Sequence, residues 1–173
     1  PMNTETEIPV TPAEATSASN IQTVDFSSEA KKLYRKIAKL PKRVKVIDMS
    51  ADFRLRDPAV YAEWYGGEHS APQLLKDAVY GLTEHYAKEI KAARLVACPG
   101  CYPTAVLLAL LPLAKAKLIV ADGVIIDAKS GVSGAGRTLK QNILFSESGE
   151  GLSPYGIGNH RHVPEIEQEL SAA

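Results

Sequence analysis

The hydrophobic pattern first becomes helical after residue 27. Ser27 or Ser28 can cap a helix there, and apolar side chains then recur every three or four positions. These positions are Ala30, Leu33, Tyr34, Ile37 and Leu40. Pro41 ends the helix, and the β-rich run over residues 44–49 predicts a buried strand after it. Residues 1–26 follow neither period, so we predict an irregular tail there.

Beyond this strand, helical and strand patterns alternate along the chain. The helices that we predict cover residues 58–65, 86–93, 104–117 and a last stretch opened by Pro164. The further strands that we predict cover residues 94–97 and 120–128. The helix over 104–117 is apolar on most sides, which predicts that it is buried. Such alternation is typical of an α/β fold with a parallel sheet.

Composition narrows the kinds of function that this chain can have. Apolar residues make up 45% of the chain, which is enough for a core. Twenty basic side chains balance twenty acidic ones, so no global field attracts nucleic acid or an anionic membrane. No stretch approaches the apolar length of a membrane span. The first thirty residues lack a signal-peptide core, and two cysteines make no disulfide scaffold. We therefore expect the cytoplasm, or an organelle matrix or stroma if a transit peptide has been removed.

The strongest chemical signal is Val-Ala-Cys-Pro-Gly-Cys-Tyr-Pro-Thr-Ala at residues 96–105. A Pro-Gly turn delivers Cys101 to the start of a predicted helix, where the helix dipole favours a thiolate. We predict that Cys101 is a nucleophile that forms a covalent acyl intermediate. The spacing of Cys98 and Cys101 also fits a thioredoxin-like dithiol, which stays an alternative. A zinc site is disfavoured, because the chain has no second cysteine pair.

Two histidines stand directly before the last predicted helix, in the segment Asn-His-Arg-His at residues 159–162. An imidazole displayed there can pass a proton to and from a reacting oxygen near neutral pH, which suits His160 or His162. Arg161 can hold a carboxylate or phosphate through two parallel hydrogen bonds. The same segment is also compatible with two solvated histidines and an ordinary surface charge.

A glycine-rich segment over residues 131–138 nearly matches the phosphate-binding pattern G-x-x-x-x-G-K-[ST]. Arg137 stands where that pattern has lysine, and the pattern uses the lysine as a point charge on phosphate oxygens. We therefore predict a loop for close backbone approach, with Arg137 near an anion, and not nucleotide hydrolysis.

The segment Ser-Ala-Asp-Phe-Arg follows the first predicted strand, at the end where α/β proteins gather ligands. It places Ser50 at the expected ligand edge. The alternative is an Asx-type turn in which Arg54 pairs with Asp52 or Asp57.

These segments together resemble N-acetyl-γ-glutamyl-phosphate reductase, an enzyme family of arginine biosynthesis. The matching stretches are residues 47–55, 80–82, 99–105, 127–137 and 160–168. The Cys101 and Ser130 segments are specific motifs and follow the order of the family.

The resemblance implies an NADPH-dependent oxidoreductase that converts an acyl phosphate to N-acetylglutamate semialdehyde and phosphate. Cys101 would carry the thioester, and His160 or His162 would be the acid/base, with His160 favoured. Substrate-binding residues would be Arg161, Arg137 and Tyr102. Cofactor-binding residues would be Ser50, Ser130, Gly131 and Gly134. The resemblance implies a small-molecule substrate and a homo-oligomer, with no metal, nucleic acid or membrane.

In fold, the resemblance implies part of a Rossmann-like parallel sheet joined to part of an α+β catalytic and dimerisation domain. We expect residues 27–101 to belong to the first domain and residues 102–173 to the second. The family opens with a G-x-x-G-x-x-G turn, whereas residues 1–40 contain no glycine. The chain is therefore expected to be an interior or truncated portion, and a non-catalytic binding or assembly module stays a further alternative.

Overall fold

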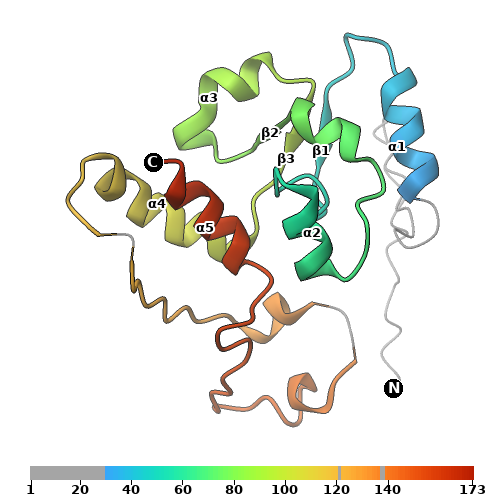
Figure 1. Cartoon of the computed structure of the whole chain (residues 1–173). Helices are drawn as coiled ribbons and strands as arrows, with labels where there is room; N and C mark the ends of the chain where they lie inside the picture. Colours follow the sequence, from blue (N-terminus) through green and yellow to red (C-terminus); the bar gives the residue numbers. More distant parts are fainter. Residues whose placement is uncertain (1–29, 121, 137–138) are drawn as a thin grey trace, which may run out of the picture.

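A computed structural model describes residues 30–173 with the exception of residues 121, 137 and 138 (Figure 1). The predicted tail over residues 1–26 lies outside the described residues. The α-helices are α1 (Ala30–Lys39), α2 (Pro58–Tyr65), α3 (Thr83–Ala92), α4 (Cys101–Lys115) and α5 (Val163–Ser171). The strands are β1 (Val46–Asp48), β2 (Ala78–Tyr80) and β3 (Leu95–Ala97), and three short 3-10 helices are η1 (Pro72–Asp77), η2 (Val132–Ala135) and η3 (Gln141–Ile143).

The three strands form one parallel sheet in the order β1-β3-β2. In the register of this sheet, Val96 of β3 lies between Ile47 of β1 and Val79 of β2. The carboxyl ends of the strands therefore meet at one edge, where the backbone N–H of Cys98 donates to the carbonyl of Asp48 at 2.8 Å. This arrangement confirms the predicted α/β fold with a parallel sheet and brings the segments after β1 and β3 together.

Among the described residues, two apolar clusters hold the helices in place. The first packs α1 and η1 around β3 and consists of Tyr34, Ile37, Phe53, Ala71, Leu75, Leu95 and Ala97. The second joins α4 to α5, which lie side by side in Figure 1, and consists of Tyr80, Leu82, Leu107, Leu111 and Ile166. Because Tyr80 ends β2 and Ile166 lies in α5, the second cluster fixes the last helix against the sheet.

Local signals explain the short helix α2, whose predicted bounds are confirmed. Asp57 caps the helix by accepting the N–H of Ala59 at 2.8 Å, and Pro58 occupies its first position. Gly66 ends it with a left-handed φ of 77°, which a side chain would strain.

The prediction of a strand over residues 120–128 is wrong. No described residue of this segment is in a strand, and the side chain of Ile125 is 93% exposed. A strand needs a neighbour for its backbone groups, and this segment has none in the part of the chain that the structure describes. Conversely, β2 was not predicted, because three residues give little periodicity and pairing with β3 is what makes them a strand.

The buried helix predicted over residues 104–117 is α4, but it begins three residues earlier, at Cys101. Only one face of it is buried, since Leu108 and Leu113 are 36% and 39% exposed. Among the helices of the described residues, none has the length and apolarity to cross a membrane.

Candidate active site

The site is built around the turn between β3 and α4. Strand β3 ends at Ala97, and Gly100 caps α4 in an extended conformation, with φ −64° and ψ 156°. Thr104 closes the turn, because its backbone N–H and its hydroxyl both donate to the carbonyl of Gly100, at 2.9 and 2.8 Å. Cys101 is thereby the first helical residue, and its free thiol is exposed at the positive end of the helix dipole.

The two histidines lie against this turn. The ring of His162 packs directly on Gly100, since a Cβ at that position would lie 2.5 Å from His162 Nε2. The rings of His160 and His162 are 4.7 Å apart, and Tyr102 lies edge-on to both, at 5.2 and 5.9 Å. The structure therefore places the two predicted imidazoles against Gly100 and Tyr102, which are the residues on either side of Cys101.

Hydrogen bonding separates the two imidazoles chemically. His160 Nδ1 accepts the backbone N–H of His162 at 3.1 Å, so the proton of neutral His160 is carried on Nε2. His162 Nδ1 is buried without a hydrogen-bond partner among the described residues. Burial lowers the pKa of His162 to about 4, with help from His160 and Arg54. Burial and then the charge of Arg161 also lower the pKa of His160, so both rings are neutral at pH 7.

A cavity of about 770 Å³ opens beside the histidines. Its wall includes Tyr102, Ser130, Tyr155, His160 and His162. The hydroxyls of Tyr102 and Tyr155 are hydrogen-bonded at 2.5 Å, and the Tyr155 ring lies 5.6 Å from that of His160. The cavity is large enough for a small ligand, and it has aromatic, hydroxyl and imidazole groups on its wall.

Of the other predicted site residues that the structure describes, only Ser130 lies on the cavity wall. Arg161 turns toward α2, with its guanidinium 5.8 Å from the centre of the Tyr65 ring. The hydroxyl of Ser50 donates to Asp48 Oδ2 at 2.9 Å. Ser130 lines the cavity, whereas Gly131 and Gly134 are exposed outside it. Arg137 lies outside the described residues.

Sequence reasoning missed the residues that hold the turn. The alternative interpretation, in which Arg54 pairs with Asp52 or Asp57, is wrong, because the Nε of Arg54 donates to the Cys98 carbonyl at 2.7 Å. Its Nη1 lies 3.8 Å from Oε2 of Glu165, a carboxylate that is 1% exposed. The only sequence signal for Glu165 was an acidic residue in the first turn of a helix, which is ordinarily explained by the helix dipole.

The described residues contain no group of three or more His, Cys, Asp and Glu side chains with the geometry of a metal site. Cys98 and Cys101 are both free thiols, with Cys98 partly buried. The chemistry available at this site is thus that of one exposed thiol, two neutral imidazoles and the backbone N–H groups at the start of α4.

Comparisons with known proteins agree with the resemblance. The family model described as "Semialdehyde dehydrogenase, NAD binding domain" matches residues 1–93, and "Semialdehyde dehydrogenase, dimerisation domain" matches residues 101–173. A rice protein named "Probable N-acetyl-gamma-glutamyl-phosphate reductase, chloroplastic" is 63% identical over 134 residues, which are 78% of this chain and 32% of the relative. The N-acetyl-gamma-glutamyl-phosphate reductase of Afipia carboxidovorans is 58% identical over 79% of this chain and 39% of its own length.

The chain therefore spans between 32% and 39% of the length of the curated relatives that it matches. The resemblance predicted from the sequence motifs is confirmed. With a family model that covers residues 1–93 and a second that covers residues 101–173, the chain belongs to the semialdehyde dehydrogenase family.

Proposed function

We propose that this chain contributes the catalytic turn of an NADPH-dependent N-acetyl-γ-glutamyl-phosphate reductase, an enzyme of arginine biosynthesis. The observation that carries the proposal is the exposed Cys101 thiol at the first residue of α4, on a turn that is in contact with His162. The names of relatives with 54% to 63% identity support the substrate and the reaction.

In the first step, Cys101 Sγ attacks the carbonyl carbon of the acyl phosphate. A sulfur–carbon bond forms, the carbon–oxygen bond to phosphate breaks, and phosphate leaves with the electron pair. The first N–H groups of a helix have no partner within the helix. The N–H groups of Cys101 and Tyr102 are therefore free to stabilise the developing oxyanion.

The acid/base role is assigned to His160. Its Nε2 carries the proton, because Nδ1 is occupied by the backbone N–H of His162. Its ring lies on the cavity wall, where it can give that proton to a substrate oxygen. His162 packs on Gly100 and stays neutral at pH 7, so its role is to hold the turn.

The loop at Ser130 fits a nicotinamide cofactor. Ser130 lies on the cavity wall with the histidines, and a Cβ at Gly131 would meet nothing within 4 Å, so a ligand can approach this backbone. Ser130, Gly131 and Gly134 would hold the cofactor, whereas the Ser50 hydroxyl is already bonded to Asp48. NADPH, when bound, would supply the hydride that reduces the thioester carbon. The carbon–sulfur bond then breaks as the carbonyl re-forms, His160 takes its proton back from the substrate oxygen, and the sulfur of Cys101 leaves with the electron pair.

We also propose the residues that bind the substrate, the assembly of the protein and its compartment. Tyr102 faces the cavity, and Arg161 and Arg137 would bind the anionic end of the substrate. We place the boundary between the dinucleotide-binding and catalytic domains at Cys101 and propose a homo-oligomer, in keeping with the matched dimerisation domain. The rice relative is named as chloroplastic, which supports the plastid stroma of the two compartments that we predict.

The nucleophile is tested by mass spectrometry after incubation with an acyl phosphate. Cys101→Ala should abolish covalent acylation, whereas Cys98→Ala should keep most of it. Equal labelling of the two variants would overturn the proposal. A reversible 98–101 disulfide in the untreated chain would favour the dithiol alternative. A calorimetric titration with NADPH separates the reductase from a non-catalytic module, which would show no binding.

A further inference from the structure

We propose that Glu165 is a positioning residue for the Cys101 nucleophile, because its carboxylate fixes the orientation of the Cys98–Cys101 turn. The inference rests on the proposed function, since it concerns how the same thiol is presented to an acyl group.

The contact is direct. Glu165 Oε1 accepts the backbone N–H of Gly100 at 2.8 Å and the hydroxyl of Tyr80 at 2.6 Å. The carbonyl of Gly100 is held on its other side by Thr104. Both polar backbone groups of the residue before the nucleophile are thus bonded, and the direction of the next N–H group, that of Cys101, is set by them.

The same carboxylate joins three parts of the fold to the turn. Glu165 comes from the first turn of α5, three residues after His162, and Tyr80 ends β2. Arg54, which follows β1, donates to the Cys98 carbonyl and lies 3.8 Å from Glu165 Oε2. The start of α5 therefore contacts the turn twice, through the ring of its N-cap residue His162 and through Glu165, so its position affects both the thiol and the imidazoles.

The Glu165 carboxylate is buried, and burying a charged group costs free energy that an apolar side chain would not cost. Glu165 is 1% exposed, Oε2 has no hydrogen-bond partner among the described residues, and burial raises its pKa. An apolar side chain of this size would fill the same volume at lower cost, since a buried charge is costly unless it is fully paired. The arrangement is explained if the acceptor oxygen is needed at Gly100.

A second buried carboxylate on α5 provides the matched comparison. Glu169 is 0% exposed and lies one turn further along the same helix. Its partners are Arg56 at 2.7 Å, the hydroxyl of Tyr86 at 2.5 Å and the side-chain amide of Gln168 at 3.0 Å, and none of them belongs to the turn. Burial of a carboxylate is therefore common to both residues, and only Glu165 contacts the residue before the nucleophile.

The test separates two reactions of the same thiol. Acetyl phosphate acylates Cys101 with loss of phosphate, and the oxyanion formed on the way depends on oriented N–H groups. Iodoacetamide alkylates it with loss of iodide and needs only a reachable thiolate. The rate ratio of acylation to alkylation at Cys101, followed by mass spectrometry, thus reports the orientation of the turn and not the integrity of the fold alone.

Glu165→Asp keeps the charge and withdraws the carboxylate from Gly100, so we expect the ratio to fall about tenfold or more. Glu165→Gln keeps an acceptor oxygen of the same reach and should stay within about threefold of the unmodified chain, as should the control Glu169→Asp. A ratio for Glu165→Asp equal to that of Glu169→Asp would overturn the inference. Should Glu165→Asp fail to fold, Tyr80→Phe removes one bond to Oε1, and an unchanged ratio there would overturn it as well.

The outcome also distinguishes this inference from the proposed function. If the unmodified chain is alkylated but never acylated at Cys101, the proposed function fails. If the unmodified chain is acylated and neither Glu165→Asp nor Tyr80→Phe lowers the ratio, only the role of Glu165 fails.

Discussion

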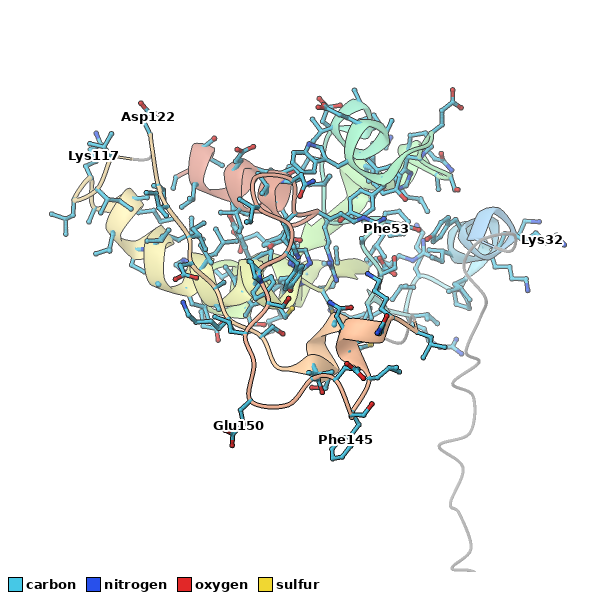
Figure 2. The ribbon with its side chains drawn as sticks, turned by 90° about the horizontal axis from the view of Figure 1, so that it is seen from below. Lys32, Phe53, Lys117, Asp122, Phe145 and Glu150 are labelled. Atoms are coloured by element: carbon cyan, nitrogen blue, oxygen red, sulfur yellow. The ribbon has the colours of Figure 1, made fainter. Side chains whose placement is uncertain are left out.

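Two glycine-containing segments stood out in this sequence, and the fold treats them differently. The turn over Cys98–Cys101 is bonded at its backbone by Asp48, Arg54, Thr104 and Glu165. The loop over residues 130–136 is exposed at every position, and its internal bonds are local ones, such as that from the Ser130 hydroxyl to the Gly131 carbonyl. The segment over residues 139–152 is also largely exposed, and Figure 2 shows the side chains of Phe145 and Glu150 pointing outward.

The contrast shows that a glycine pattern can serve two purposes. At Gly100 the missing side chain makes room for an imidazole of the protein itself. At Gly131 it leaves open backbone that a ligand can approach. A turn that presents a nucleophile needs fixed geometry, whereas a loop that receives a ligand can take part of its order from binding.

The different roles of the two glycines are tested most directly by replacing Gly100 and Gly131 with alanine, which adds one methyl group at each position. In Gly100→Ala the Cβ would lie 2.5 Å from His162 Nε2, so the ring or the turn must move. We expect acylation of Cys101 to fall by about a hundredfold and the free energy of unfolding by about 1–3 kcal/mol. The measurements are acylation by mass spectrometry and urea unfolding.

Gly131→Ala is the matched control for stability. Its φ of −70° suits alanine, and the added Cβ meets nothing within 4 Å. The free energy of unfolding should change by less than about 0.5 kcal/mol. Equal destabilisation by the two substitutions would contradict the different roles assigned to these glycines.

A smaller effect is expected from pH at the held turn. The pKa of His162 is about 4 in the folded chain and near its ordinary 6.5 when unfolded. The unfolded state therefore binds the extra proton, so this stabilisation is present above pH 6.5 and is lost as the pH falls toward 4. After allowance for the partial exposure of the ring, the loss should be about 2 kcal/mol.

His162→Gln should remove this part of the acid sensitivity. The loss of stability between pH 7 and pH 4.5, measured by urea unfolding, should be smaller in that variant than in the unmodified chain. His85→Gln is the control, because His85 lies in α3, outside the site. The same pH dependence in all three chains would show that the His162 ring is not buried against the turn.

The smallest expected effect concerns the tyrosines on the cavity wall. The hydrogen bond with Tyr102, followed by burial, raises the pKa of Tyr155 to about 12. Tyr102→Phe should bring this pKa back toward 10, and the change is measured from phenolate absorbance during an alkaline titration. The difference from Tyr155→Phe identifies the titrating group, and an unchanged Tyr155 titration would mean that the two hydroxyls are not bonded.

The structural features that could be predicted from the sequence are those that depend on neighbouring residues. The bounds of α2 follow from Asp57, Pro58 and Gly66, which act on the helix that they flank. The Pro-Gly turn likewise places Cys101 at a helix start. Signals of this kind are complete within a few positions, so one sequence is enough to read them.

What the sequence could not predict depends on partners far along the chain. Strand β2 exists because residues 78–80 pair with β3, and the run over 120–128 is irregular because it has no partner among the described residues. The bond from Gly100 to Glu165 spans 65 positions. No local sequence pattern predicts such a contact. Only the folded structure shows that Glu165, in the first turn of α5, is buried.

The bonds that fasten α5 have one more consequence. Gln168 and Glu169 reach back to Arg54 and Arg56, residues more than a hundred positions earlier. Figure 1 shows the stretch before α5 looping away from the molecule between α4 and α5, which lie side by side. A protease that cleaved this stretch would leave two fragments held together by these bonds, with Cys101 on the first fragment and His160 and His162 on the second.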